Sequence, residues 1–367
     1  MSVAIWGLGT ALPPLAISQS EAAKIGAQVC CTTDEQTRFL STIYRRSGIR
    51  KRYSVLLEES NGSAVSQSFF APRVTAEDRG PSTGERMQLY REKAAPLALA
   101  AARKAIDASA LRASDVTHVI TISCTGFTAP GIDIALVTAL PLAPTVKRTH
   151  IGFMGCHGVL NGLQVAQAIA QAGVDSRVLV CAVELCSLHL HYGWDREKVV
   201  TNALFSDGAA ALVAAKSGTP AAESTVILMT LVSTGSFVFP DTEDAMAWQI
   251  GDHGFEMTLS AGVPELLSKH LRPWFCQWLA RSGLRLSDVR SWAIHPGGPR
   301  ILSAVEQALG LDRAATAVSR DVLARCGNMS SPTILFILDR LLSLRAPRPY
   351  VALGFGPGLV VEAVLFS

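Results

Sequence analysis

Cys156 is the residue in this sequence whose surroundings best suit nucleophilic chemistry. It lies in the stretch His150–Leu163, where a predicted strand turns through glycine into a predicted helix. A thiol in the first turn of a helix faces unpaired backbone N–H groups and the positive end of the helix dipole, and both favour the thiolate. With an imidazolium nearby, we expect the pKa of Cys156 to be low enough for the thiolate to predominate at neutral pH. A cysteine packed inertly behind a tight turn is the competing interpretation.

His295 and Asn328 are the two residues that could complete such a site. His295 ends a predicted strand and is followed by Pro-Gly-Gly. This would place its imidazole at the carboxyl edge of a sheet, where open α/β sheets hold their ligands. Asn328 follows Gly327 at the predicted start of a helix, the place that Cys156 takes earlier in the chain. Taken alone, a single histidine is more often structural than catalytic.

A thiol, an imidazole and a carboxamide together suit chemistry on a thioester. The sulfur accepts an acyl group, while the N–H groups of the imidazole and the carboxamide stabilise an enolate or an oxyanion. A cysteine hydrolase would instead use its third group to orient the histidine as a base. The spacing of the three residues does not separate these reactions, so the architecture of the chain must decide between them.

The elements that would position these residues occur twice, in the same order. Each copy contains the hexapeptide LRxSDV, a strand, a small-residue turn that opens a helix, and a second buried strand. In the first copy these features follow a helix over 93–108 and occupy residues 111–116, 117–123, 155–172 and 177–183, respectively. In the second copy the same four features occupy residues 284–289, 290–295, 327–344 and 350–355. The repeat predicts a duplicated α/β fold whose halves, related by a pseudo-twofold axis, bring Cys156 and Asn328 together with His295 nearby.

Length and composition agree with two packed units. The chain has 367 residues, of which 49% are apolar and 17% charged. This excludes a disordered chain and indicates strands buried on both faces or a large subunit interface. A polar stretch over 216–223 separates the copies, so we divide the chain into 1–222, with the cysteine, and 223–367, with the histidine and the asparagine. Residues 45–88 are expected to form a surface excursion towards a partner or a ligand mouth.

Charge and cysteine content exclude several function classes. The net charge of +3 is too balanced for a general nucleic-acid binder. No apolar run approaches the roughly 18 residues of a membrane helix, and the apolar N-terminus reads as a first strand rather than a signal peptide. Eight cysteines without a CxxC pair indicate neither a disulfide framework nor a zinc site. We therefore expect a cytoplasmic protein without metal, and we interpret Cys186, His189 and His191 as strand-end packing rather than as ligands.

Five segments of the sequence resemble the type III polyketide synthases, the chalcone and stilbene synthase family, and hence the thiolase-type fold. They are Gly155–Gly158 (GCHG), Ala203–Ala211 (ALFSDGAAA), Ile294–Gly298 (IHPGG), Gly327–Ser331 (GNMSS) and Gly354–Gly358 (GFGPG). The resemblance spans nearly the whole chain, and GFGPG with GNMSS and LFILD distinguishes this family from the related ketoacyl synthase III enzymes. It implies a thiolase-like fold of duplicated αβαβα layered halves, and a homodimer.

The resemblance also implies a role for each of the three candidate residues. Cys156 would be the nucleophile that accepts a starter acyl group from an acyl-CoA. His295 would pair with the thiolate and, with Asn328, would stabilise the enolate that forms when malonyl-CoA loses carbon dioxide. The CoA thioesters are substrates in this chemistry, and no separate cofactor is implied.

The family pattern places gatekeeper residues between a CoA tunnel and a reaction cavity. Phe205 matches the first gatekeeper phenylalanine, and Met257 stands where the family has the second. Methionine is unbranched and adaptable, so it would open the tunnel. Trp248 stands where the plant enzymes have a small glycine in the cavity, and it would fill space there.

Other positions of the expected cavity also depart from the plant enzymes. Cys124, Cys186 and His189 stand where those enzymes have threonines, which implies a pocket of different shape and polarity and argues against chalcone as the product. The glycine-rich segment that includes Gly356 and Pro357 would form part of the cavity wall, since only glycine lets backbone approach a bound chain so closely.

The expected CoA-binding residues are Arg46, Gly297 and Arg300. Arg46 falls on one of the family's phosphate-contacting positions, whereas Phe39 and Thr42 occupy the other two. Other basic residues of the same segment could compensate, or a carrier protein could replace free CoA as the acyl donor. These residues are Arg45, Arg50 and Lys51.

We expect a homodimeric enzyme that loads an acyl-CoA starter on Cys156, extends it with malonyl-CoA, and releases a pyrone, resorcinol or related phenolic product. A stand-alone ketosynthase that joins two acyl or β-ketoacyl chains, with an acyl carrier protein as partner, is the second hypothesis. A non-catalytic acyl-binding protein is the third, although binding alone requires no nucleophile. None of the three needs a nucleic acid or a membrane.

Overall fold

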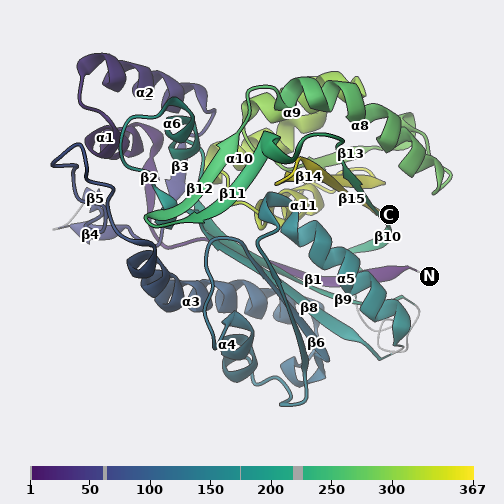
Figure 1. Ribbon diagram of the computed structural model, residues 1–367. Coiled ribbons are helices and arrows are strands. Elements are labelled where there is room, and N and C mark those ends of the chain that lie inside the picture. Colours follow the sequence, from purple (N-terminus) through teal and green to yellow (C-terminus); the bar gives the residue numbers. More distant parts are fainter. Residues whose placement is uncertain (1, 61–63, 174, 218–225) are drawn as a thin grey trace.

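A nine-stranded mixed sheet forms the centre of the computed structural model, which describes residues 2–60, 64–173, 175–217 and 226–367 (Figure 1). The strands are β1 (Val3–Ala11), β2 (Ala16–Ser18), β3 (Lys51–Tyr53), β4 (Glu58–Ser60), β5 (Ala64–Ser66), β6 (His118–Ser123), β7 (Lys147–Gly152), β8 (Arg177–Leu185), β9 (Asp207–Lys216), β10 (Met229–Val238), β11 (Met246–Gly251), β12 (Gly254–Leu259), β13 (Ser291–Ile294), β14 (Tyr350–Gly356) and β15 (Val360–Phe366). The central sheet has the order β13-β14-β15-β10-β1-β9-β8-β6-β7. The predicted division between residues 222 and 223 lies outside the described residues.

Helices cover both faces of this sheet and also lie between its two halves (Figure 1). They are α1 (Gln19–Cys30), α2 (Asp34–Arg46), α3 (Thr83–Ser109), α4 (Ile132–Ala139), α5 (Gly158–Ala172), α6 (Arg196–Asn202), α8 (Val263–Ala280), α9 (Pro299–Leu309), α10 (Ala317–Cys326) and α11 (Thr333–Ser343). Within the described residues, no helix combines the length and the apolarity that crossing a bilayer requires.

The strand order repeats within the sheet, as the duplication predicts. In the first half β6 and β8 are parallel, and β9 runs antiparallel to both β8 and β1. In the second half β13 and β14 are parallel, and β15 runs antiparallel to both β14 and β10. The two halves form one continuous sheet because Val3–Ile5 of β1 pairs with Met229–Leu231 of β10. The predicted α/β fold therefore contains two copies of one strand pattern joined at their first strands.

Three large hydrophobic cores fill the spaces between the layers. One core packs α3 and α4 against the outer face of the first half, and another packs α8 and α9 against the outer face of the second half. The middle core contains α5, α11 and the inner faces of both halves. Strand β8 shows how one sequence serves two cores, because Val178 and Val180 point to the middle core while Leu179 and Cys181 point to the outer one. The layers therefore follow the order helix, sheet, helix, sheet, helix.

The two LRxSDV hexapeptides adopt the same local structure. In each, the aspartate ends a short 3-10 turn and its carboxylate accepts a hydrogen bond from the backbone N–H of the arginine three residues earlier, at 3.2 Å for Asp115 and Arg112 and at 2.8 Å for Asp288 and Arg285. Such a side-chain bond closes the turn and leads the chain into the following strand. The matching residues mark the turn that joins the outer helix to the sheet in each half.

Two expectations for local structure are wrong in part. Residues 83–88 belong to α3 rather than to the predicted surface excursion, because Ser82 and Glu85 form a reciprocal capping box that starts the helix there. The helix of the second copy does not begin beside Asn328. It begins at Thr333, and the intervening residues form a turn with Ser330 in a left-handed conformation (φ 55°).

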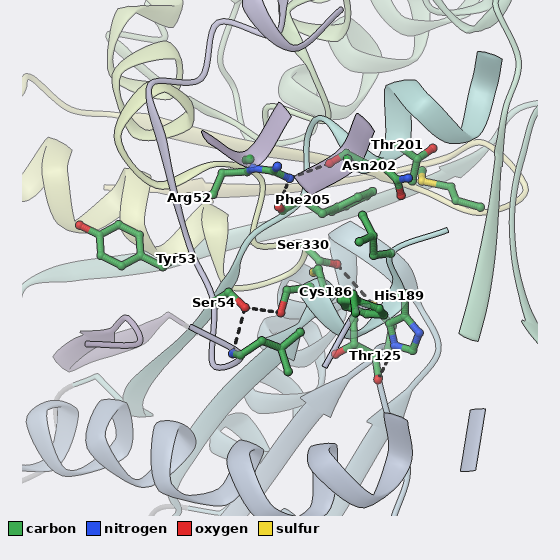
Figure 2. Close-up of a pocket in the computed structure, with 18 of the residues that line it drawn as sticks. Arg52, Tyr53, Ser54, Thr125, Cys186, His189, Thr201, Asn202, Phe205 and Ser330 are labelled. Carbon is green, nitrogen blue, oxygen red and sulfur yellow. Dashed lines mark hydrogen bonds between the residues drawn. The ribbon is translucent and has the colours of Figure 1, made fainter. Parts of the chain in front are cut away.

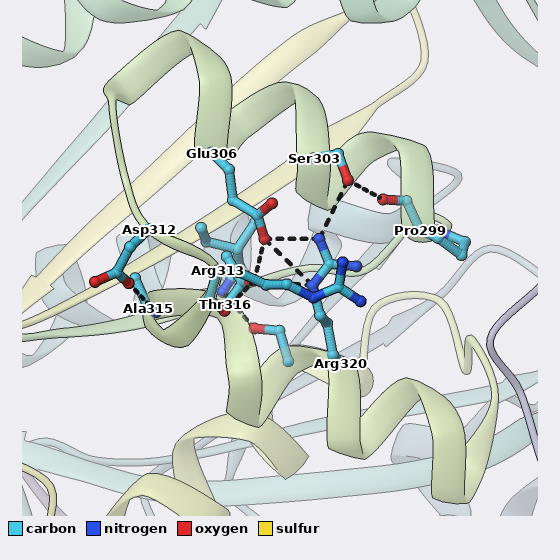
Figure 3. Close-up of polar contacts among 10 residues, drawn as sticks. Pro299, Ser303, Glu306, Asp312, Arg313, Ala315, Thr316 and Arg320 are labelled. Carbon is cyan, nitrogen blue, oxygen red and sulfur yellow. Dashed lines mark hydrogen bonds and ion pairs between the residues drawn. The ribbon is translucent and has the colours of Figure 1, made fainter.

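Glu306 of α9 and Arg320 of α10 hold together the elements that carry His295 and Asn328. Arg320 donates to Glu306 at 2.6 and 3.2 Å, and the hydroxyl of Thr316 donates to the same carboxylate (Figure 3). Ser319 of α10 accepts a hydrogen bond from the backbone N–H of Ile294, one residue before His295. This half-buried ion pair therefore fixes α10 between the end of β13 and the start of the Asn328 turn.

Candidate active site

Cys156 lies in a 3-10 turn, Gly155–His157, between β7 and α5. Gly155 has a φ of +73°, and a Cβ on it would lie 2.5 Å from Cδ of Pro357. Glycine is therefore required here both for the left-handed turn and for the close approach of the second half of the chain. The turn holds the thiol, which is half-buried, at the inner end of α5.

Asn328 and Ser330 come from the second half of the chain and meet Cys156. The backbone of Asn328 pairs with the segment of Phe205, since its N–H donates to Leu204 at 3.0 Å and its carbonyl accepts from Ser206 at 2.9 Å. Asn328 Oδ1 then accepts from the backbone N–H of Ser330 at 2.8 Å. This turn brings both side chains near the thiol, and each of them lowers the pKa of Cys156.

The expectation of a low Cys156 pKa is wrong for this ligand-free structure. Burial raises the pKa of the Cys156 thiol to about 12, and the charge of Glu184 raises it further, although hydrogen bonds from Ser330 and Asn328 act in the opposite direction. Loss of water around the sulfur outweighs the donors that the helix end and the Asn328 turn provide. The resting nucleophile is therefore a thiol.

Glu184, at the inner end of β8, is a residue of the site that sequence reasoning missed. Its fully buried carboxylate accepts hydrogen bonds from the backbone N–H of Cys124 at 3.0 Å, from the hydroxyl of Thr125 at 2.7 Å and from the hydroxyl of Ser331 at 2.8 Å. Burial raises its pKa, and these donors lower it. The signal in the sequence was a single acidic residue within an otherwise apolar strand, because such a residue must find several donors.

His295 is buried at the end of β13, with 1% of its surface exposed. Its backbone N–H donates to Leu353 at 2.8 Å, but neither ring nitrogen has a hydrogen-bond partner among the described residues. Burial lowers the pKa of His295 to about 3, and the charge of His157 contributes to the lowering. The structure therefore brings Asn328 close to Cys156, and it leaves His295 neutral beside His157 with no hydrogen bond to its ring.

A cavity opens above the thiol and has about 1090 Å³ of empty space, its open mouth included. Figure 2 shows Arg52, Phe205 and Asn202 on one side of it, with Cys186 and His189 across from them. The predicted pocket residues that line the cavity are Phe205, Met257, Trp248, Cys124, Cys186, His189 and Pro357. Cys156 is also part of the lining, so the thiol and the predicted pocket residues share one space.

The placement of Gly356 in the cavity wall is wrong. A Cβ on Gly356 would lie 2.3 Å from Cδ2 and 2.4 Å from Nε2 of His157, and one on Gly354 would lie 3.1 Å from Cβ of the same histidine. The space that these two glycines leave is therefore filled by the imidazole of His157, not by a ligand.

An aromatic cluster closes one side of the cavity. His189 stacks on Phe255 with a centroid distance of 4.3 Å, and Trp248 meets both rings edge-on. His189 Nε2 donates to the carbonyl of Thr125 at 2.8 Å and its Nδ1 accepts from the backbone N–H of Phe255 at 2.9 Å. Both nitrogens are used, and burial lowers the pKa of His189 to about 3, so this histidine serves as a neutral wall. Trp248 fills the space expected of it and donates to the carbonyl of Cys124 at 2.7 Å.

Part of the cavity lining is apolar and comes from the N-terminal region of the chain, and we call this part the apolar arm. Arg52 also lines the cavity and is fixed in place, because it donates to the carbonyls of Asn202 at 2.6 Å and Phe205 at 3.0 Å (Figure 2). The arm consists of aliphatic and aromatic side chains from β2, α1 and the segment between β3 and α3. These residues are Ile17, Ala22, Ile25, Leu56, Leu57 and Phe70.

Two of the expected CoA-binding residues, Arg46 and Arg300, lie on neighbouring surface segments, which we call the basic rim. Arg46 is exposed in the last turn of α2, and Arg300 is exposed in the first turn of α9, two residues after the packed helix cap Gly298. The two segments are neighbours, since a Cβ on Gly48 would lie 3.5 Å from Pro299. The rim thus combines cationic side chains from both halves of the chain.

Gly297 directly precedes the cap of α9, and the two departures from the family pattern lie on α2. The backbone N–H of Gly297 donates to the carbonyl of His295 at 3.1 Å. A side chain would nearly fit at this position, because a Cβ on Gly297 would lie 3.4 Å from its nearest neighbour, Ile301. Phe39 packs edge-on against Trp194 at 5.6 Å. Thr42 donates to the carbonyl of Arg38 at 3.0 Å within α2. These three residues offer no charge to a phosphate.

Comparison with known proteins identifies matches over nearly the whole chain. The family models for the N-terminal and C-terminal domains of chalcone and stilbene synthases match residues 2–217 and 230–367. An alpha-pyrone synthesis polyketide synthase-like protein of Mycobacterium tuberculosis is 33% identical over 99% of this chain and 90% of its own length. A 1,3,6,8-tetrahydroxynaphthalene synthase of Streptomyces peucetius is 32% identical over 97% of this chain and 90% of its own length.

Solved structures match the fold equally well. The crystal structure of PKS-I from the brown alga Ectocarpus siliculosus aligns with a TM-score of 0.90 and 30% identity, over 100% of this chain and 98% of the algal one. The agreement covers both halves of the sheet, so the turns that carry Cys156 and Asn328 belong to a fold that is already known from solved structures.

Proposed function

This chain belongs to the chalcone and stilbene synthase family and is a type III polyketide synthase, and on that premise we propose that Cys156 carries the growing acyl chain while His295 and Asn328 assist each condensation. The observation that carries the proposal is that the polar side chains of Asn328 and Ser330 approach Cys156 at the inner end of a cavity and lower the pKa of its thiol. Such donors stabilise a sulfur anion, and they also stabilise an oxyanion at a carbonyl attached to that sulfur.

Loading begins from the neutral pair. Since the pKa of Cys156 is raised and that of His295 is lowered, the proton of the thiol passes to His295 only as the sulfur attacks the acyl carbonyl of the incoming CoA thioester. The carbon–sulfur bond to CoA then breaks, and the departing CoA thiolate takes the proton from His295. The result is an acyl group on Cys156 and a neutral imidazole, with atoms and charge balanced.

Extension uses the same donors at a different oxygen. The bond between the malonyl carboxylate and its methylene carbon breaks, carbon dioxide leaves, and the electron pair forms an enolate of acetyl-CoA. Asn328 Nδ2 and an N–H of His295 stabilise the enolate oxygen. The enolate carbon attacks the acyl group on Cys156, the carbon–sulfur bond to Cys156 breaks, and a chain longer by two carbons remains on CoA. Burial keeps water away from the enolate during this step.

The lining of the cavity supports a particular class of starter and product. The arm is apolar, so the starter is an acyl-CoA with an aliphatic chain that lies along it. Elsewhere in the lining Trp248 and His189 limit the space for extension, which favours few condensations. Together with the relative whose name refers to alpha-pyrone synthesis, this supports a pyrone that carries an alkyl chain.

Two copies of the chain form the working enzyme. Strand β7 is an edge of the sheet, and its residues from Lys147 to His150 are exposed. Three large apolar side chains nearby are exposed as well, namely Phe127 (42%), Ile134 (38%) and Met154 (38%). A second copy that covers this edge would bury the apolar side chains and satisfy the free edge of the strand.

All eight cysteines are free thiols, which agrees with a reducing cytoplasm.

A carrier-protein-bound donor is the second candidate. Phe39 and Thr42 offer no charge to a CoA phosphate, and Arg50 is engaged with Asp321 at 3.6 Å. A ketosynthase that joins two preformed chains would need fewer contacts to CoA. Turnover with an acyl-CoA and with the same acyl group on a carrier protein separates the two, because the family reaction requires the CoA form to be used efficiently.

The proposal is tested by incubation of the purified protein with malonyl-CoA and acyl-CoA starters of increasing chain length. We expect an acyl group on Cys156, release of carbon dioxide and pyrone products, with neither the acyl-enzyme nor the pyrone formed by Cys156→Ala. Failure of every starter to label Cys156 would end the case for an extending enzyme.

A further inference from the structure

A second imidazole is buried directly beside the nucleophile. His157 follows Cys156 in the 3-10 turn and has only 2% of its surface exposed. Its Nδ1 lies 2.7 Å from Oδ1 of Asn161, one turn further along α5. Its Nε2 is buried and has no hydrogen-bond partner among the described residues. A buried polar atom without a partner is costly, so its position calls for an explanation.

The family's glycine-rich strand makes room for this ring. Gly354 and Gly356 lie two residues apart on β14 and therefore point to the same face. A Cβ on Gly356 would lie 2.3 Å from Cδ2 of the His157 imidazole, and a Cβ on Gly354 would lie 3.1 Å from Cβ of the same residue. His157 is consequently held in one place between α5 and β14.

The same strand places His157 beside His295. β13 and β14 are parallel with Ile294 opposite Leu353, and the N–H of His295 continues the ladder to the carbonyl of Leu353 at 2.8 Å. The next pair in this register sets His295 opposite Gly354, so both point to the same face of the sheet. That is the face on which His157 packs over Gly354. Both imidazoles are thus neighbours, and both nitrogens of His295 are free.

The hydrogen bonds that connect Glu362, Asn161 and His157 fix which nitrogen of His157 carries the proton. Glu362 of β15 is 4% exposed, accepts from Ser236 at 2.6 Å and forms a side-chain hydrogen bond with Asn161. A carboxylate can only accept, so the amide nitrogen of Asn161 faces Glu362 and its oxygen faces His157. The hydrogen of the His157 ring must then reside on Nδ1. In the neutral ring, Nε2 is left with a lone pair and no proton.

We propose that His157 is a positioning residue for His295, which rests on the proposed function of His295 as the partner of Cys156. The lone pair of His157 Nε2 accepts the second N–H of His295 when His295 takes the proton of the thiol. One S–H bond breaks and one N–H bond forms in this step, and no other co-reactant is needed. The chain of donors then runs from His295 through His157 and Asn161 to Glu362, which orients the imidazolium while its other N–H serves the thioester.

The electrostatics of the surrounding groups agree with this assignment. Burial lowers the pKa of His157, which keeps the ring neutral and its lone pair available. A charge on His157 would lower the pKa of His295, so protonation of both rings at once is unfavourable. Glu184 acts on Cys156, and Glu362 acts on the other side of the group through Asn161.

The test is the pH profile of Cys156 alkylation by iodoacetamide, with steady-state turnover measured alongside. His157→Phe keeps the ring volume between the glycines but removes the acceptor, and we expect the half-maximal pH to rise by about one unit, that is about tenfold slower alkylation at neutral pH. The kcat for condensation should fall by about the same factor while KM for the acyl-CoA stays within about twofold. His157→Gln retains an acceptor near the position of Nε2 and should recover part of both losses.

Further variants decide the remaining outcomes. His118→Phe, at the far end of β6, is the matched control and should keep the wild-type profile. If His157→Phe does not fold, Asn161→Leu takes its place, because it keeps the imidazole of His157 but removes the acceptor of its Nδ1–H. A rise in the half-maximal pH of Cys156 alkylation then supports the proposal, and an unchanged pH profile overturns it. Identical profiles for His157→Phe and His157→Gln also overturn it. Absence of an acyl group on wild-type Cys156 would instead overturn the proposed function, since alkylation needs no substrate.

Discussion

The hydroxyl of Ser331 donates to Oε1 of Glu184 over 2.8 Å, which joins the second half of the chain to the first directly beside the nucleophile. Glu184 ends a strand of the first half, and Ser331 follows the turn that presents Asn328. The same carboxylate holds the segment after β6 through Cys124 and Thr125. One buried group therefore sets the separation between the thiol and the residues that assist it.

Glu184→Gln should destabilise the protein and slow condensation. The NH₂ group of the new glutamine would face N–H and O–H donors that now bind the carboxylate. At least one buried donor would then lose its acceptor, at a cost of about 1–3 kcal/mol. Thermal and urea unfolding measure the change in the free energy of unfolding. The exposed Glu197→Gln is the control, and equal stability of the two variants would contradict the role assigned to Glu184.

Asn328→Ala should separate loading from extension. The side chain stabilises charge on the enolate oxygen, and loss of one such donor lowers the rate by roughly 10²–10³-fold. Loading of Cys156 should persist, because Ser330 and His295 remain. Mass spectrometry of the acyl-enzyme and carbon dioxide release measure the two steps. Equal loss of both steps would show that Asn328 only supports the fold of the site.

Trp248→Gly should change the products. Trp248 closes the cavity together with His189 and Phe255, so its removal lengthens the space available to an extended chain. We expect products with more malonyl units, together with a lower melting temperature because Cys124 loses a donor to its carbonyl. The masses of the products formed from one starter measure the number of malonyl units added. Trp274→Phe, which lies outside the cavity, is the control. Unchanged products would place the limit on chain growth elsewhere.

Leu57→Trp should shorten the acceptable starter. Leu57 lines the apolar arm, and a larger ring there fills the path of an aliphatic chain. The kcat/KM for long acyl-CoA starters should fall by about tenfold or more, while that for acetyl-CoA stays nearly constant, since a loss of several buried methylenes is worth at least about 1.4 kcal/mol. Leu344→Trp on the surface serves as control. A uniform loss over all chain lengths would argue against the arm as the starter site.

Phe127→Asp should weaken the dimer. Phe127 is 42% exposed beside the free edge β7, where a second copy would cover it. Burial of an unpaired charge opposes association, so light scattering should show a shift from two copies to one at micromolar concentration. Val238→Asp, at a more exposed apolar position on β10 (61%), is the control. A monomeric wild-type protein would refute the proposed interface at once.

Buried histidines should make the protein sensitive to acid. Burial lowers the pKa of His189 to about 3 and that of His191 to about 4, from an ordinary value of 6.5. The folded state binds these protons less readily than the unfolded chain, so their contribution to stability is complete above pH 6.5 and is lost as the pH falls towards 3 or 4. Each should reduce the free energy of unfolding by about 1.4 kcal/mol per pH unit within that window.

Urea unfolding between pH 7 and pH 4 measures this slope. His189→Gln should reduce it by the equivalent of one proton. Parallel slopes for wild type and His189→Gln would mean that His189 is protonated in the folded state, in conflict with its two hydrogen bonds.

The order of elements could be determined from the sequence by itself. Strand and helix periodicity, the repeated LRxSDV turns and the glycines around Cys156 and Asn328 are local signals, and local backbone preferences act on neighbouring residues. They were sufficient to predict the duplicated α/β fold and to place the thiol and the carboxamide in matching turns. The same signals placed the start of α11 too early, because the turn after Asn328 depends on its pairing with the segment of Phe205.

The tertiary structure alone decided the electrostatics and the occupancy of the site. Burial by layers distant in sequence raises the pKa of Cys156 against the local effect of the helix end. The convergence of Glu184 with Ser331, and of His157 with Gly356, likewise joins residues from opposite halves of the chain. Desolvation and packing depend on all atoms within a few ångströms, whatever their place in the chain, so no pattern along the sequence reports them.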